Sequence, residues 1–249
     1  MRSGNDYMTV ASALDKIPLR DYILSRLANQ VGSAKVVRVW DRDLGVDFDG
    51  VLRGVYCLKA NHDSRYHARI ALLCTDEKLA HARNEANRWL ASTYGEFSCQ
   101  WWYGLIDRKV FLKESLTGED ADGPLEDYRF HIINGKAAFL QLDVGLGAQE
   151  RHNPIHDENL NYLPCESVRD KLHEAELPAL AGPVQEIEIE LGSKYQYCRV
   201  DLYVKDQSFL LGELTFLPNA VPRKVQSSEL DDYICLFWRG DMPEPTRIE

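Results

Sequence analysis

The 249-residue sequence predicts an α+β fold, and three observations support this prediction. Strand-like and helix-like segments mix along the chain without the regular βαβ alternation of a doubly wound sheet. The dipeptide Asn134-Gly135 separates two alternating apolar runs, which is the strongest short-range signal for a β-hairpin. Hydrophobic residues make up 45% of the chain and charged residues 27%, as in ordinary globular domains. Length and composition therefore support a buried core and exclude a collagen, a disordered chain and a mucin-like stalk.

The first half of the chain predicts two helices and four strands. A helix is expected at residues 8–30, because Leu14, Ile17, Tyr22, Ile23 and Leu27 fall roughly on one helical face. A second helix begins at Asp76, which we expect to cap it, and runs to about Leu90. Strands are predicted at residues 35–40, 54–59, 68–74 and 109–116.

The second half predicts two hairpins. One pairs residues 127–133 with 136–143 across Asn134-Gly135. The other pairs residues 198–204 with 209–216 across a polar KDQS turn. Between them, residues 146–168 are polar and irregular and residues 168–180 are expected to be helical, while the tail from residue 242 is expected to be loose.

Charge, hydropathy and cysteine spacing argue against several kinds of partner and site. The net charge is −10, and residues 111–249 carry 26 acidic against 13 basic side chains, so we expect no nucleic-acid partner. The chain has no run of about 18 apolar residues and no apolar signal core at its N-terminus, which predicts a cytoplasmic protein without a membrane partner. The six cysteines lie far apart without a C-x-x-C pair, which argues against a zinc site or a disulfide framework.

A group of charged residues on the second hairpin is the first candidate site. Asp201 and Glu213 can lie opposite one another on adjacent strands, and Thr215 points to the same face as Glu213 because side chains alternate with period two. With Arg199 beside them, two facing carboxylates suit a Mg²⁺ ion that bridges phosphate oxygens. The alternative is a solvent-facing sheet surface with incidental charges.

A polar loop after the strand at residues 54–59 is the second candidate site. Lys59 stands at its edge, and His62, Ser64 and Arg65 within it are possible donors to an anion. The alternative is an ordinary β-turn with a surface lysine, since the loop contains no glycine.

Six motifs in a fixed order resemble those of the TupA-like ATP-grasp family, which is associated with teichuronopeptide and other surface-polysaccharide pathways. They are Asp15-Lys16-x-x-x-Arg20-Asp21-Tyr22, Leu58-Lys59-x-Asn61-His62-x-Ser64, Asn87-Arg88-Trp89-Leu90, Gln100-Trp101-Trp102-Tyr103, Asp127-Tyr128-Arg129-Phe130 with Asn134-Gly135-Lys136, and Arg199-Val200-Asp201-Leu202-Tyr203 with Gly212-Glu213-Leu214-Thr215-Phe216. The resemblance extends from about Asp15 to about Gly240 and includes a hinge strand at residues 110–116.

The resemblance implies an ATP-grasp fold, in which two α+β subdomains sandwich a nucleotide, here with a truncated N-terminal domain. It implies an N-terminal helix and connecting segment at residues 1–50 and a smaller, lid-like subdomain at residues 51–112. A larger subdomain with the metal site is implied at residues 113–249. The implied cofactors are ATP and Mg²⁺.

The resemblance also implies roles for individual residues. Lys59 would bind the α- and β-phosphates, with Arg20 as a second candidate, and His62 and Ser64 would lie in the loop that covers the triphosphate. The hinge at Lys113, Glu114 and Leu116 would meet the adenine edge, and Glu119 or Asp120 the ribose. Asp201, Glu213 and Thr215 would hold Mg²⁺. Arg129 would point toward the phosphates, and Arg199 would stabilise charge on the transferring phosphoryl group or acyl-phosphate.

The sequence departs from the family pattern at two places. The family loop N-H-G-S-G has Asp63 and Arg65 in place of both glycines, which removes backbone freedom and adds one charge of each sign. The hinge has Lys113 where the family has Glu, with Glu114 one place later. A shift of one residue moves a strand side chain to the other face, so Glu114 cannot simply substitute.

The resemblance implies an ATP-dependent carboxylate–amine ligase that forms an amide through an acyl-phosphate, in surface-polysaccharide or specialised-metabolite biosynthesis. The expected partners are a small carboxylate, such as a uronic acid or amino acid, and an amine, with a homodimer possible. A phosphotransferase that uses the same site and a nucleotide-binding subunit without turnover are the alternatives.

Other conspicuous residues have simpler interpretations. His131 and His173 are expected to be structural or surface groups. The aromatic run Trp101-Trp102-Tyr103 is expected to pack in the core rather than stack on a sugar. The polar segment at residues 147–164, with Arg151, His152 and Asn153, is expected to contact the acceptor, because binding specificity tends to lie in loops.

Overall fold

The computed structural model describes residues 15–27, 30–42, 45–63, 66–72, 75–94, 100–117, 126–143, 152–164, 177, 181–193, 195–205, 208–216 and 227–239. The chain divides into two compact units, Met1–Gly123 and Pro124–Glu249. The resemblance implies a subdomain boundary after residue 112, whereas the units divide after Gly123. The strand that contains residue 112 pairs with two other strands of the first unit and therefore belongs to it.

The first unit contains a four-stranded antiparallel sheet in the order β2-β5-β3-β4. Its strands are β2 (Val36–Trp40), β3 (Val55–Ala60), β4 (His67–Ala71) and β5 (Val110–Glu114), and the short strand β1 (Val31–Gly32) precedes them. Its helices are α2 (Lys16–Leu27), α3 (Asp76–Ala91) and the 3₁₀ turn η1 (Trp101–Leu105).

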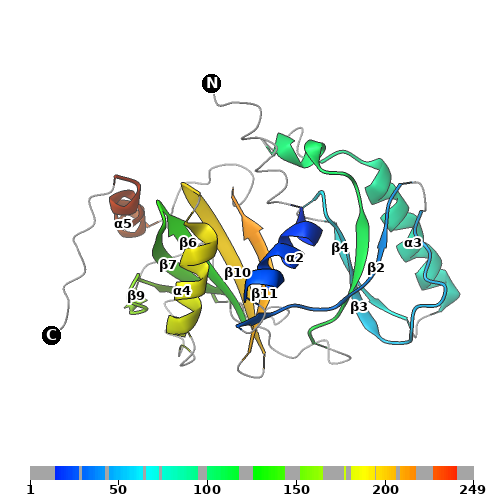
Figure 1. The fold of residues 1–249 in the computed structure, drawn as a ribbon, viewed down its shortest axis with the longest axis horizontal. Helices are drawn as coiled ribbons and strands as arrows, with labels where there is room; N and C mark the ends of the chain where they lie inside the picture. Colours follow the sequence, from blue (N-terminus) through cyan, green and yellow to red (C-terminus); the bar gives the residue numbers. More distant parts are fainter. Residues whose placement is uncertain are drawn as a thin grey trace. The chain divides into compact units, whose positions relative to one another are not determined.

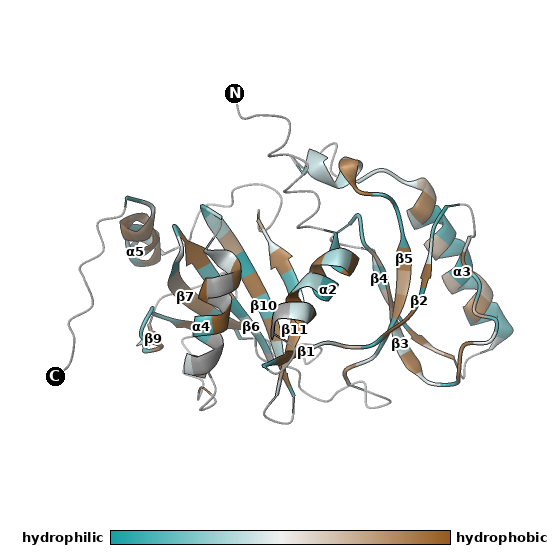
Figure 2. Ribbon diagram, in the orientation of Figure 1, coloured by the Kyte–Doolittle hydropathy of each residue, from teal (hydrophilic) through white to brown (hydrophobic). Residues whose placement is uncertain are grey.

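Helix α3 covers one face of this sheet. Apolar residues of the helix, Ala82, Ala86, Trp89 and Leu90, pack with the inward strand residues Tyr56, Leu58, Ala60, Ile70 and Leu112. Polar residues occupy the outer face of the helix, as the teal and brown segments of Figure 2 show. The other face of the sheet is therefore free of this core.

The second unit is built on an antiparallel sheet with the strand order β11-β10-β6-β7-β8-β9. Its strands are β6 (Glu126–Ile133), β7 (Lys136–Asp143), β8 (Ile155–His156), β9 (Tyr162–Leu163), β10 (Tyr197–Lys205) and β11 (Ser208–Thr215). Helix α4 (Ala181–Gly192) packs against β6, β7 and β10, as Figure 1 shows.

Helices α4 and α5 bury different residues of the second sheet. At the end of α4, Gly192 lies so close to Ile132 that a Cβ would stand 2.7 Å from the Ile132 side chain. Helix α5 (Ser228–Arg239) buries Leu230 and Phe237 in a cluster with Ile133, Ala138, Phe139 and Ile155. Because Ile132 and Ile133 alternate along β6, the two helices pack on opposite faces of that strand.

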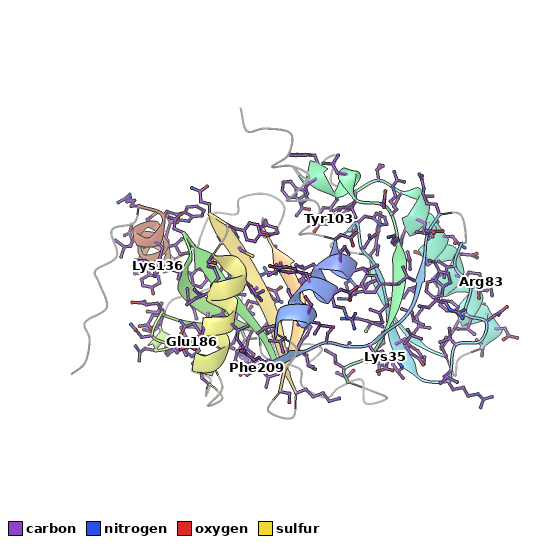
Figure 3. The ribbon with its side chains drawn as sticks, in the orientation of Figure 1. Lys35, Arg83, Tyr103, Lys136, Glu186 and Phe209 are labelled. Atoms are coloured by element: carbon purple, nitrogen blue, oxygen red, sulfur yellow. The ribbon has the colours of Figure 1, made fainter. Side chains whose placement is uncertain are left out.

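The first hairpin of the second unit forms as predicted. Asn134 and Gly135 have φ values of 50° and 77°, which are the left-handed conformations of a two-residue type I′ turn. Lys136, labelled in Figure 3, is the first residue of the returning strand β7. The Asn134 side chain also donates a hydrogen bond of 2.9 Å to the Phe237 carbonyl, which ties the turn to α5.

The structure differs from the sequence predictions at several helices. Thr75, not Asp76, is the N-cap of α3, and Asp76 lies in the first turn of the helix. Tyr22 of α2 is 45% exposed, so it does not belong to the inner face of that helix, whereas Ile23 is fully buried. The sequence predicts neither α4 nor α5, while the helix expected at residues 168–180 lies almost wholly outside the described residues.

None of the described helices has the length and apolar character needed to cross a membrane.

Candidate active site

One face of the second unit's sheet carries a continuous group of polar side chains, which we call the charged face. Strand pairing aligns its members in three rows: Thr215, Arg199 and His131; Glu213, Asp201, Arg129 and Gln141; and Tyr203, Asp127 and Asp143. Residues directly opposite in adjacent strands point to the same side of a sheet. The rows therefore bring residues from four strands together on one surface.

Strand alternation explains why the charged face forms. On β6, Tyr128, Phe130 and Ile132 are buried on one side, and Asp127, Arg129 and His131 alternate with them. On β10, Cys198, Val200 and Leu202 are fully buried in the same alternating way. Because the apolar residues of both strands pack on the side of α4, the alternating charged residues are placed on the other side of the sheet.

Gly212 interrupts the alternation of β11 beside the predicted metal ligands. The register shifts here, so that Asp201 faces Glu213 while the next residue, Leu202, faces Leu211. A Cβ on Gly212 would lie 2.7 Å from the Asp201 carbonyl oxygen, so a larger residue does not fit without movement of the strand. This irregularity keeps Glu213 directly across from Asp201, as the sequence predicts.

Arg199 and Asp201 form a bidentate ion pair. The Nε and Nη2 atoms of Arg199 lie 2.6 and 2.5 Å from the two carboxylate oxygens of Asp201, and Nη2 also donates to Thr215 Oγ1 at 3.3 Å. Burial raises the pKa of the Asp201 carboxyl to about 7, with opposition from the Arg199 guanidinium and support from the Asp127 and Glu213 carboxylates. The structure therefore brings together Arg199, Asp201, Glu213 and Thr215, all four residues predicted on this hairpin.

Arg129 is clamped between two carboxylates. Its guanidinium lies 2.7 Å from Asp127 Oδ2 and 2.8 Å from Asp143 Oδ2, and both aspartates are buried. Burial raises the pKa of the Asp127 carboxyl, while Arg129 opposes the rise. Arg129 thus lies on the same face as Asp201, which is its partner in the register, and its guanidinium pairs with the carboxylates of Asp127 and Asp143.

The charged face offers the donors that Mg²⁺ prefers. Asp201, Glu213 and Thr215 supply only oxygen atoms, and Mg²⁺ commonly takes one or two protein carboxylates together with substrate phosphates. The Oδ1 atom of Asp127 is buried and has no hydrogen-bond partner among the described residues, which also fits a cation nearby. Within that part of the chain, no three His, Cys, Asp or Glu side chains form a complete metal cage. The donor set therefore fits Mg²⁺ carried in with phosphates, provided that Asp201 exchanges its contacts with Arg199.

The first unit presents a second polar surface, which we call the basic face. Lys59 pairs with Phe111 and with His67, and the neighbouring Cys57 pairs with Lys113 and with Arg69. These residues share the side of the sheet away from α3, whereas Glu114 pairs with the inward Tyr56. Lys113, and not Glu114, therefore lies on the same face as Lys59, as the one-residue shift predicts.

The start of the loop after β3 is held by the beginning of α2. The Asp15 carboxylate accepts hydrogen bonds from the Ile17 amide and from Asn61 Nδ2, both at 3.2 Å. Lys16 Nζ donates to the carbonyl oxygens of Ala60, at 3.3 Å, and Asp63, at 2.5 Å. The first two family motifs thus meet within the first unit and support one another.

His62 and Asp63 point into the first unit. His62 is 1% exposed, its Nε2 lies 2.9 Å from the Trp89 carbonyl, and its Nδ1 lies 3.1 Å from Asn61 Oδ1. Asp63 is fully buried and its Oδ1 accepts a hydrogen bond from the Tyr66 amide at 2.8 Å. These contacts hold the side chains of His62 and Asp63 in place, and nucleotide binding by His62 stays a prediction.

The remaining predicted residues fall into two groups. Arg20 of α2 donates to Ser33 Oγ at 2.9 Å and pairs with Asp21 at 2.8 Å. Leu116 is partly buried just after β5. Ser64, Asp120 and the alternative Glu119 lie outside the described residues, as do Arg65, Arg151 and His173.

The aromatic run Trp101-Trp102-Tyr103, which is expected in the core, is only partly packed there. Tyr103, labelled in Figure 3, is buried and contacts Tyr94 at 5.4 Å between ring centroids, whereas Trp101 is 47% exposed. In the segment expected to contact the acceptor, the side chain of Asn153 is buried. It donates a hydrogen bond to the Leu142 carbonyl at 3.3 Å and so supports β7.

Sequence reasoning missed several members of the charged face. From the sequence alone, Asp143 and Gln141 of β7, Asp127 of β6 and Tyr203 of β10 are not proposed as site residues, and His131 is expected to be a structural or surface group. The period-two alternation of each strand was a signal that could have found them. It could not by itself show that β6 pairs with β10, because these strands are about 70 residues apart in the chain.

Three solved structures illustrate the similarity of the fold. The D-alanine–D-alanine ligase from Bacillus anthracis complexed with ATP matches with a TM-score of 0.52 and 15% identity, over 93% of this chain and 68% of that one. A second structure of that enzyme matches with a TM-score of 0.53 and 16% identity, over 91% and 64%. The ATP-grasp ligase PsnB with a minimal precursor gives a TM-score of 0.47 and 12% identity, over 92% and 62%.

The chain thus spans roughly two thirds of the length of the ligases that it resembles, and no curated protein sequence matches it. A family model described as TupA-like ATP-grasp matches residues 10–235, which is most of the chain. The charged face, the basic face and this match lead to one conclusion: the chain belongs to the TupA-like ATP-grasp family and has the ATP-grasp fold.

Proposed function

We propose that the chain is an ATP- and Mg²⁺-dependent ligase that joins a carboxylate to an amine through an acyl-phosphate. Membership of the ATP-grasp family supports the use of ATP. The observation that carries the proposal is the placement of Asp201 directly across from Glu213, with Arg199 beside Asp201 and Arg129 in the same row. Two carboxylates and two guanidiniums on one surface suit a metal-bound polyphosphate and the charge that develops during phosphoryl transfer.

The chemistry balances in two steps. A carboxylate oxygen of the first substrate attacks the γ-phosphorus of ATP, and ADP leaves. The amine then attacks the acyl carbon, phosphate leaves, and the amine gives up a proton to form the amide. When bound, Mg²⁺ supplies charge neutralisation at the phosphate oxygens.

The chain's own residues would position the reactants. Lys59, a cation on the basic face, suits the phosphate oxygens of ATP, and the hinge at Lys113, on the same face, would meet the adenine edge. Arg199 lies beside Asp201 and donates to Thr215, so once Asp201 exchanges its contact with Arg199 for the metal, the guanidinium would be free to bind an oxyanion on the same face. The Asp201 and Glu213 carboxylates would hold the metal, and Arg129 would lie near the phosphates.

The proposed substrates are a small carboxylate, such as a uronic acid or amino acid, and a small amine. Association of the family with surface polymers favours a place in surface-polysaccharide or specialised-metabolite biosynthesis. The chain is proposed to act with these small molecules and without nucleic acid.

Substitution of the proposed metal ligands tests the function. We expect Asp201→Asn and Glu213→Gln each to reduce ADP release by on the order of 10²–10³-fold, because each removes a charge that faces the transferring group. The assay screens uronic acids and amino acids against a panel of amines, with ADP and product both measured. Glu186→Gln, at an exposed position on α4, is the matched control and should keep wild-type turnover.

Product analysis decides between the ligase and its alternatives. An amide formed together with ADP and phosphate supports the ligase. A stable phosphorylated product would replace it with a phosphotransferase, and nucleotide binding without turnover would indicate a subunit that does not catalyse. Full ADP release by both carboxylate variants would overturn the proposed metal site.

A further inference from the structure

His131 is a buried histidine on the charged face that the proposed reaction does not yet use. It is 8% exposed, and its ring stacks on Phe139 with 3.9 Å between centroids and 18° between planes. Its Nδ1 lies 3.0 Å from the Tyr197 hydroxyl, and its Nε2 has no hydrogen-bond partner among the described residues. A fixed ring with one buried, unsatisfied nitrogen calls for an explanation.

The contact with Tyr197 indicates which nitrogen carries the proton. Burial raises the pKa of Tyr197, so its hydroxyl stays protonated and needs an acceptor. If the hydroxyl donates to Nδ1, only the Nε2–H group is left without a partner. If Nδ1–H donates instead, both the tyrosine O–H and Nε2 are left unsatisfied. The first arrangement leaves fewer buried polar groups unpaired, so it is favoured, and Nε2 is then a donor.

The neighbours of His131 determine what that donor can bind. Arg199 lies directly opposite in the register, and Arg129 is two residues away on the same strand and face. Burial lowers the pKa of His131 well below its ordinary value, and both arginines lower it further, so the ring is neutral. A neutral N–H donor beside a guanidinium suits an oxyanion and does not suit a metal ion or an ammonium group.

We propose that His131 Nε2–H and Arg199 together form a subsite for an oxyanion of the reacting group, either the substrate carboxylate or the transferring phosphate. This inference rests on the proposed function for its substrate class. Tyr197 is the positioning residue, because its hydroxyl sets the tautomer of His131. Phe139 holds the ring against rotation.

Nitrogen NMR of the whole chain with ¹⁵N-labelled histidine tests the subsite without any turnover. The His131 resonances are assigned by their loss in His131→Gln. We expect the Nε2–H tautomer in the wild type, and a mixture of tautomers in Tyr197→Phe, which cannot donate. Titration with acetate and separately with inorganic phosphate should shift Nε2 saturably, and the anion that binds more tightly identifies the source of the oxyanion.

Kinetics supply the second test once a substrate pair is known. His131→Leu removes the donor and should raise the KM of the anion's source by about tenfold, a typical cost of one lost hydrogen bond in a buried site. His131→Gln keeps an N–H donor and should recover part of the loss. His81→Gln, at an exposed position on α3, is the control.

The outcomes separate this inference from the proposed function. An Nδ1–H tautomer, or an Nε2 resonance that neither anion shifts, would overturn the subsite even if the chain proves to be a ligase. A wild-type chain without ADP release would overturn the ligase, while a saturable anion shift at Nε2 would still support the subsite.

Discussion

Arg199 and Asp201 are an ion pair that costs stability to bury. Removing two charges from water carries a penalty of several kcal/mol per ion, and a bidentate contact repays it only in part. Here the side chain of Asp201 is 5% exposed and the side chain of Arg199 is 14% exposed. Two such clusters on one sheet face, the second around Arg129, are more easily understood as a reactive surface than as a device for stability.

The burial of His62 predicts how the unfolding free energy of the chain depends on pH. Burial lowers the pKa of His62 from its ordinary value of 6.5, so below that pH the unfolded chain binds a proton that the folded chain resists. The stabilising contribution of neutral His62 is therefore present above pH 6.5 and is lost as the pH falls below it. We expect the difference in unfolding free energy between wild type and His62→Asn to shrink between pH 7.5 and 5.5.

Urea unfolding at a series of pH values measures this difference. The exposed His81→Asn variant is the control and should run parallel to the wild type. A constant difference across the range would show that the proton of His62 is not linked to folding.

At the scale of the elements, the irregularity at Gly212 connects packing to the site. The bulge in β11 places Glu213 opposite Asp201, and the backbone of β10 occupies the space that a side chain at 212 would need. A regular strand would instead shift the register and with it the face of Glu213. The absence of a side chain at position 212 thus controls how Asp201 and Glu213, the two proposed metal ligands, face one another.

We predict that Gly212→Ala destabilises the fold by about 1–3 kcal/mol, because the new methyl group overlaps the Asp201 carbonyl and β11 must move. It should also reduce ADP release, since Glu213 moves with the strand. Thermal and urea unfolding measure the first effect. Gly182→Ala in α4 is the matched control, because no atom lies within 4 Å of its added Cβ. Equal stability of the two variants would contradict the close approach at Gly212.

For the whole molecule, the relevant feature is that each unit carries one of the two surfaces to which we assign a role in the proposed function. The basic face belongs to the unit Met1–Gly123 and the charged face to the unit Pro124–Glu249. A ligand that binds only the folded chain stabilises it by mass action. Binding of Mg·ATP is therefore measurable before any substrate is known.

We predict that Mg·ATP at about 100 times its Kd stabilises the chain by about 2.7 kcal/mol, seen as a rise in Tm. Chelation of Mg²⁺ with EDTA should remove most of the rise, because the carboxylates of the charged face then meet the phosphates without a cation. Lys59→Met should reduce the rise, whereas Lys35→Met, at an exposed position in the same unit, should keep it. A rise in Tm that is independent of both Mg²⁺ and Lys59 would contradict the proposed nucleotide site.

Much of the fold was predictable from short stretches of sequence. The hairpin at Asn134-Gly135, helix α3 and the facing positions of Asp201 and Glu213 follow from turn chemistry and from the periods of helix and strand. Helices α4 and α5 were missed. In α4 a glycine and a proline stand at the start, where they weaken a helical signal, and the packing of both helices on the sheet outweighs local propensity.

The sequence by itself determined which residues alternate on each strand and which family motifs are present. It also determined the members of one group of site residues: Arg199, Asp201, Glu213 and Thr215. Only the tertiary structure decided that β6 lies beside β10. That pairing places Arg129 and His131 next to this group, and the burial that accompanies it also sets the state of His131. The physical reason is that strand alternation is a local property of the backbone. The partner of a strand, and the burial that shifts a pKa, depend instead on contacts between residues far apart in the chain.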